Sequence, residues 1–143
     1  FMTRFILCIM MLFFMGTTGA QPLGSLTSPN KKLQLQVLLD KDGSVFYTLS
    51  FSVKAAVLPG RLGVQFKEGS GFYAGLKAGK VTTSQTDEVW KPVWGEESSI
   101  RNNYNELKVE LIQPAMQDAI MLIVFRLYNE GIGLRYEWPA QPK

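Results

Sequence analysis

The segment LQLQVLLDKDGSVFYTLSF, residues 33–51, decides the fold class. Apolar residues alternate with polar ones on both sides of Asp42-Gly43, a residue pair suited to a tight β-turn. The face that this alternation predicts to be buried carries Leu33, Leu35, Val37, Leu39, Val45, Tyr47, Leu49 and Phe51. The segment therefore predicts an antiparallel β-hairpin with one face in a core.

The rest of the chain repeats this pattern in short pieces. Further strands are predicted at residues 62–66, 81–88, 107–111, 120–125 and 132–138. Pro59-Gly60 is expected to break the chain before the first of them, and the glycine-rich residues 69–79 are expected to form a flexible connection. The continuously apolar residues 120–125 indicate a strand buried on both faces. No segment of ten or more residues after the first twenty has helical spacing, so we predict an all-β, antiparallel β-sandwich.

The N-terminus has the features of an export signal. Residues 5–15 are an unbroken apolar run after Arg4, and small residues follow up to Ala20. A membrane-spanning helix needs about 20 apolar residues, which is longer than this run. We therefore predict a signal peptide at residues 1–20, followed by a single β-sandwich domain at residues 21–143 that we expect to be incomplete. We also predict no membrane span after cleavage, and a periplasmic or extracellular location.

Composition excludes several classes of function. The chain has no histidine, which removes the commonest general base and metal ligand. The single cysteine, Cys8, lies in the predicted signal, so disulfides and thiolate metal sites are not expected. Without Arg4, 14 basic side chains face 12 acidic ones, and the two signs are interspersed. Such a surface is not that of a nucleic-acid-binding protein.

Polar and aromatic residues gather around the predicted turn at Gly95. Trp94 could stack on a sugar ring, and nearby carboxylates could accept hydrogen bonds from sugar hydroxyl groups. The candidates for contact with a carbohydrate or with another domain are Trp94, Glu96, Arg101, Tyr104 and Glu106. We place these residues in a loop, where function concentrates, although a solvated loop would have a similar sequence.

Structural roles compete with these functional ones. Trp90 and Trp138 are expected to fill gaps in the core. A glycosidase needs two carboxylates at a controlled separation, and sequence spacing does not establish this geometry for Glu96 and Glu106, so we assign no catalytic residue and no metal ligand. Arg126 interrupts an apolar strand and should meet an acidic partner, because an unpaired buried charge is costly. Arg135 and Glu137 share a face and are expected to pair.

Two dense stretches carry a family resemblance. They are Trp90-Lys-Pro-Val-Trp-Gly-Glu96 running on to Arg101-Asn-Asn-Tyr-Asn-Glu106, and Phe125-Arg-Leu-Tyr-Asn-Glu-Gly131 running on to Arg135-Tyr-Glu-Trp-Pro139. Together they resemble the N-terminal domain of glycoside hydrolase family 97, and the resemblance covers residues 28 to 141. The family places a β-supersandwich, like that of galactose mutarotase, ahead of a catalytic (β/α)₈ barrel.

The resemblance implies an exported glycoside hydrolase that acts on α-glucosides or α-galactosides and binds calcium as a full-length enzyme. The barrel carboxylates have no counterpart here, so this chain is expected to be a truncated scaffold or carbohydrate-contacting domain, inactive alone and without a cofactor of its own. Its expected partners are the carbohydrate and the missing barrel. Two alternatives remain open: a free-standing carbohydrate-binding module and a structural envelope protein without a ligand.

Overall fold

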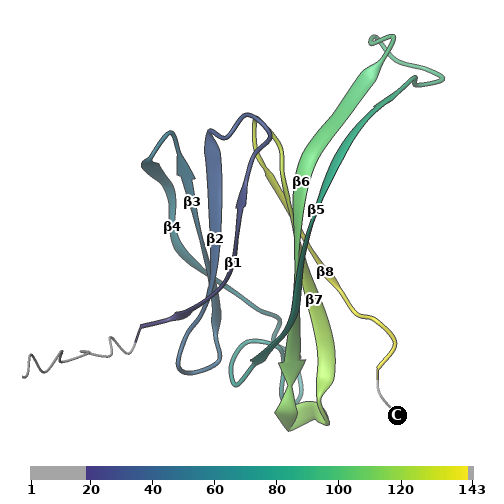
Figure 1. Cartoon of the computed structure of the whole chain (residues 1–143). Coiled ribbons are helices and arrows are strands. Elements are labelled where there is room, and N and C mark those ends of the chain that lie inside the picture. The colour runs from purple at the N-terminus through teal and green to yellow at the C-terminus, as the bar shows by residue number, and fades with distance from the viewer. Residues whose placement is uncertain (1–18, 142–143) are drawn as a thin grey trace, which may run out of the picture.

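The chain folds into two antiparallel four-stranded sheets. The computed structural model describes residues 19–141, so the predicted signal peptide lies outside the described residues except for its last two. The strands are β1 (Gln21–Thr27), β2 (Leu33–Leu39), β3 (Val45–Phe51), β4 (Lys54–Leu62), β5 (Lys77–Trp90), β6 (Ile100–Gln113), β7 (Ala119–Leu127) and β8 (Ile132–Glu137). The sheets have the strand orders β1-β2-β3-β4 and β5-β6-β7-β8 and pack face to face (Figure 1). The predicted all-β sandwich is confirmed.

The first sheet contains the hairpin that decided the fold class. β2 pairs with β3 in the expected register, with Leu33 opposite Phe51 and Leu39 opposite Val45. Gly43 has φ +70° at the turn, and a Cβ there would collide with the backbone of residues 75 and 76. Those residues donate to the turn, because Leu76 N–H bonds the Gly43 carbonyl at 3.0 Å. Glycine is therefore required at this position for both its conformation and its small size.

The core lies between the two sheets. One face of each sheet supplies side chains that are almost completely shielded from water. The second sheet contributes Leu107, Val109, Leu111, Met121, Ile123, Phe125 and Leu127, all at 0% exposure. These residues alternate along the two central strands, β6 and β7, as expected for a sheet that is buried on one face. The alternation of apolar residues in the sequence therefore accounts for these core residues.

Two expected strand positions were wrong in the first sheet. Residues 62–66 form no strand of their own, because Val64 makes only an isolated bridge to Phe72. Pro59-Gly60, expected to break the chain, lies inside β4. β4 is at the edge of its sheet, where a proline without an N–H group is tolerated. β1 was not predicted at all.

The polar segment 101–105 was expected to be a loop, and this was also wrong. It belongs to β6, which runs for 14 residues and pairs with the equally long β5. This segment lacks alternating apolar residues because its end of the hairpin extends past the first sheet (Figure 1). Neither face of the hairpin needs to be apolar there. For the same reason Trp90, expected in the core, is 49% exposed. Trp138 is also 49% exposed and lies beyond the end of β8, with its ring 6.2 Å from that of Tyr136.

The apolar strand at residues 120–125 is confirmed as part of β7, but its two faces differ. Met121, Ile123 and Phe125 fill the core. On the outer face Val124 is buried as expected, whereas Leu122 is only half-buried. The outer face of β7 is therefore buried at Val124 and only partly buried at Leu122. No helix among residues 19–141 is long and apolar enough to cross a membrane.

Candidate functional site

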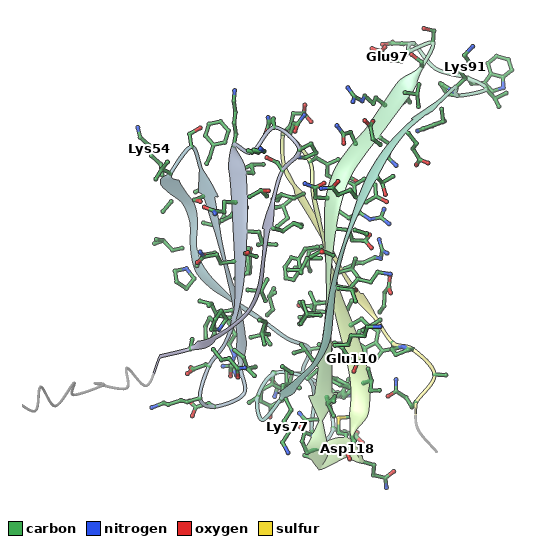
Figure 2. The ribbon with its side chains drawn as sticks, in the orientation of Figure 1. Lys54, Lys77, Lys91, Glu97, Glu110 and Asp118 are labelled. Carbon is green, nitrogen blue, oxygen red and sulfur yellow. The ribbon has the colours of Figure 1, made fainter. Side chains whose placement is uncertain are left out.

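The β5–β6 hairpin continues beyond the sandwich as a projecting arm. We define the arm as residues 87–103, the part of the hairpin beyond Tyr104, which is the first buried residue of β6. Asp87 pairs with Asn103 and Trp90 with Ile100, and residues 91–99 form the tip. In Figure 2 the labelled Lys91 and Glu97 lie at this tip, far from Lys77, Glu110 and Asp118 at the other end of the second sheet. The arm therefore presents its tip to the solvent.

The tip exposes large apolar side chains. Trp94 is 90% exposed and Val93 is 92% exposed. The next residue, Gly95, has φ +150°, a conformation that residues with a side chain rarely adopt. Glu96 follows it and is exposed as well. A fully exposed indole beside a carboxylate can stack on an apolar ligand face and accept hydrogen bonds from the same ligand.

Arg101 connects the two strands of the arm and does not belong to the tip. Its guanidinium donates two hydrogen bonds to the Asp87 carboxylate, Nε to Oδ1 and NH2 to Oδ2, both at 2.8 Å. The adjacent pair does the same work across the strands, since Asn102 Nδ2 donates to Glu88 Oε1 at 2.8 Å. The hydrogen bond from Arg101 lowers the pKa of Asp87. Two cross-strand pairs therefore fix the register just below the tip.

Tyr104 and Glu106 lie elsewhere, in a cluster on the outer face of the second sheet. Arg126 Nε donates to Glu106 Oε2 at 2.7 Å, which confirms the acidic partner expected for Arg126. The Arg126 guanidinium lies over the Tyr104 ring, with its Cζ 4.5 Å from the centroid. The Tyr104 and Tyr128 rings are 5.4 Å apart. Lys108 Nζ completes the cluster at 3.7 Å from Glu106 Oε1.

The charged side chains of this cluster pair with one another, so the cluster has a structural role. Glu106 keeps only 9% of its side chain exposed because Arg126 and Lys108 cover it. The hydrogen bond that Arg126 donates to Glu106 raises the pKa of Arg126, so this guanidinium stays charged. Nearby, Arg135 Nε donates to Glu137 Oε1 at 2.7 Å, which confirms that expected pair. The charged groups here already have partners, which leaves them little capacity for a ligand.

The five candidates thus fall into three environments. Trp94 and Glu96 share the exposed tip, Arg101 braces the arm, and Tyr104 and Glu106 belong to the outer-face cluster. Glu96 and Glu106 are not brought together as a carboxylate pair. Sequence reasoning missed Asp87 as the partner of Arg101. An antiparallel pairing of residues 81–90 with 100–109 would have suggested it, since it puts the two charges on one face.

A polar groove lies beside the base of the arm. It has a volume of about 450 Å³ and lies between β1 and the β5–β6 hairpin. Its lining is Ser25, Leu26, Thr27, Thr83, Ser84, Gln85 and Asn105. Asn105 Nδ2 donates to the Thr27 carbonyl at 2.7 Å and joins the two sheets there. Within residues 19–141 no group of three or more acidic, histidine or cysteine side chains could hold a metal ion.

Comparison with known proteins agrees with this architecture. The family model "Glycosyl-hydrolase 97 N-terminal" matches residues 26–143. Among solved structures, the chain is similar to a glycoside hydrolase family 97 enzyme from Pseudoalteromonas sp. strain K8. A variant of that enzyme in complex with panose matches with a TM-score of 0.75 at 28% identity, and the enzyme in complex with acarbose matches with 0.76 at 27%.

A beta-arabinopyranosidase has a similar fold, with a TM-score of 0.73 at 24% identity. All three matches cover 82% of this chain but only 18% of the matched one. The chain therefore spans less than a fifth of the length of these enzymes.

Proposed function

Because the chain belongs to the glycosyl-hydrolase 97 N-terminal family, we propose that it is the scaffold and carbohydrate-contacting domain of an exported hydrolase of α-glucosides or α-galactosides. The observation that carries the contacting role is Trp94, 90% exposed at the end of a braced arm. An indole held in water gains little within the domain, and it gains stacking and apolar burial when a sugar ring or another domain covers it.

Each part of the arm has a role in this proposal. Trp94 stacks on the apolar face of a sugar ring, and the Glu96 carboxylate accepts hydrogen bonds from its hydroxyl groups. The Asp87–Arg101 pair holds the two strands in register, so the tip is ordered before binding and less entropy is lost. Catalysis belongs to another part of the enzyme. For the calcium ion implied for the family, no group of three or more acidic, histidine or cysteine side chains among residues 19–141 could serve as the ligands.

The solved relatives support the proposed ligand class. The similar Pseudoalteromonas enzyme was observed with panose and with acarbose. Panose is an α-linked oligosaccharide and is the natural first probe for the arm. The barrel of the same enzyme is the second proposed partner. It would contact those apolar side chains of the tip that the sugar does not cover.

A site-resolved titration tests the sugar contact. The indole N–H resonance of Trp94 should move on addition of panose, and the resonance of Trp138 should stay in place. Glu96→Gln should weaken the response severalfold because it removes a charged acceptor, with Glu97→Gln as the matched control. A Trp94 resonance that ignores panose at millimolar concentration contradicts the sugar contact.

A free-standing carbohydrate-binding module is the alternative that the same exposed tryptophan supports. Both versions predict that Trp94 responds to sugar, so the gene sequence after residue 143 decides between them. A continuing reading frame that encodes a barrel supports the scaffold domain, and a stop codon supports the module. In either case we expect no hydrolysis of aryl α-glucosides by residues 21–143, and turnover above that of a Glu96→Gln/Glu106→Gln double variant would contradict this.

A further inference from the structure

The outer face of the first sheet carries an uncharged polar surface. Two rows of paired residues cross β1, β2 and β3, with Gln36 between Ser25 and Thr48, and Gln34 between Thr27 and Ser50. All six side chains are amides or hydroxyls. The outer face of the second sheet is the opposite, because Glu106, Lys108 and Arg126 are interlocked there. These two rows of the first sheet therefore carry no charged side chain.

A shallow depression of about 230 Å³ lies over these two rows. Its floor includes Gln34, Gln36, Thr48 and Ser50, and its wall includes Val53, Ala55, Leu58 and Pro59. Leu58 is 76% exposed. No charged side chain lines the depression. Hydrogen-bonding groups beside exposed apolar side chains are the combination found in ligand-binding sites.

A β-bulge in β4 builds the wall. Tyr47 pairs with Gly60 and Leu49 pairs with Val57, so Leu58 and Pro59 both stand opposite Thr48. Such an extra residue bends the strand and re-aims a side chain, and bulges are frequent beside binding sites. Here the bulge places the exposed Leu58 opposite Thr48, whose hydroxyl belongs to the floor.

The turn at the end of the depression is strained. Ser52 and Val53 have φ +45° and +73°, although hairpin turns of this kind favour asparagine and glycine. A β-branched residue at positive φ is a true outlier, and Val53 is 99% exposed, so packing within the domain does not compensate for it. Strain of this kind concentrates at ligand sites.

We propose that this depression binds a neutral oligosaccharide at a second site, separate from the arm. The inference rests on the proposed function for its ligand class but uses none of the arm residues. Amide and hydroxyl groups donate and accept hydrogen bonds with sugar hydroxyls, and neighbouring strands are about 4.8 Å apart, so one chain of sugar rings meets several of them. Leu58 and Val53 contact the C–H faces of the rings. Without a charged partner, an anionic sugar has nothing to offset its lost hydration.

Backbone amide shifts during titration with maltotriose test this proposal. Residues 34, 36, 48, 50 and 58 should shift together and saturate. Gln36→Glu should weaken binding roughly tenfold, because the added charge is desolvated without a partner. Gln85→Glu, an exposed amide on the second sheet, is the matched control and should bind as the parent does. Leu58→Asp should weaken binding similarly at a position too exposed to disturb folding.

Trp94→Ala separates this proposal from the proposed function. It removes the arm residue and should leave the shifts of the depression unchanged. Shifts confined to the arm, or none at all, overturn the second site. Equal affinity for trigalacturonate overturns the requirement for a neutral ligand. Shifts that appear with rising protein concentration and no sugar show that a second copy of the chain covers this face, which also overturns the proposal.

Discussion

The lower and upper halves of strand β6 use the same backbone pairing for opposite purposes. In the sandwich, Leu107 and Leu111 are completely buried between the sheets. In the arm, Arg101 continues the same face of the same strand and is largely exposed in its pair with Asp87. Stability of this domain therefore comes from the sandwich. The arm adds almost no apolar burial, so its exposed tryptophan and valine point to contact with something outside the domain.

Removing a core side chain of the sandwich should give the largest change in the free energy of unfolding. Leu107→Ala removes a fully buried side chain whose methyl groups approach Gly24 of the other sheet. We expect a loss of about 2–5 kcal/mol in the free energy of unfolding, from lost burial and the cavity left behind. Urea denaturation measures it. Val89→Ala on the arm, 64% exposed, is the control and should cost under about 0.5 kcal/mol. Equal losses would erase the distinction between the two regions.

The outer-face cluster should rank second. Glu106→Gln keeps the side-chain shape but leaves the Arg126 guanidinium without its charged acceptor. We expect a loss of about 1–2 kcal/mol, below the value for a fully buried pair because Arg126 is 32% exposed. Glu137→Gln breaks a more exposed pair and should cost under about 1 kcal/mol. Thermal or urea unfolding of the two variants side by side checks the order.

Relief of strain at the β3–β4 turn should stabilise the sandwich. Val53→Gly removes a β-branched side chain from φ +73°, and we expect a gain of about 1 kcal/mol after the greater freedom of glycine in the unfolded chain is counted. Val93→Gly is the matched control on the arm, where φ is negative and no strain is relieved. Stabilisation by the control instead of by Val53→Gly would contradict the strain at this turn.

The sequence predicted the fold where burial imposed a pattern. The alternating pattern of residues 33–51 predicted β2 and β3, because residues of a buried face must alternate with residues of a solvated one. The same logic failed at Arg101 to Asn105, since an arm that packs against nothing needs no apolar face. It also failed at Pro59, which is tolerated because β4 lies at an edge and bulges there.

The candidate site was foreseen only in part. Trp94 and Gly95 signalled an exposed turn, and the positive charge of Arg126 in an apolar strand signalled its partner. The pairing of Arg101 with Asp87 depends on strand register, and the depression on the first sheet depends on a bulge. The register follows only once residues 81–90 are known to pair with residues 100–109, and the bulge leaves no local mark in the sequence, so the structure was needed for both.

The arm should tolerate loss of its tryptophan. Trp94→Ala should change the free energy of unfolding by less than about 0.5 kcal/mol, because a side chain that is 90% exposed buries little in the folded state. The same substitution should remove the contact with sugar at the tip. Urea denaturation together with a panose titration followed at the Glu96 amide measures both effects. A large loss of stability would show that the indole packs within the domain and would blur the contrast between arm and sandwich.

The smallest effect is expected from the brace of the arm, and it depends on pH. The hydrogen bond from Arg101 holds the pKa of Asp87 below its usual range, near 3.9 in an unfolded chain. A group whose pKa is lowered by folding stabilises the folded state above that unfolded value, and the contribution disappears as the pH falls through the lowered pKa. Titration of the Asp87 carboxyl by NMR should show the low pKa, and Arg101→Gln should return it toward 3.9. The protection factors for amide exchange of residues 87–103, which correct for slower intrinsic exchange in acid, should fall as Asp87 is protonated. Those of residues 107–111 should stay high, because protonation loosens the arm and leaves the sandwich intact. An Asp87 pKa that ignores the Arg101→Gln change would show that the pair does not brace the arm in solution.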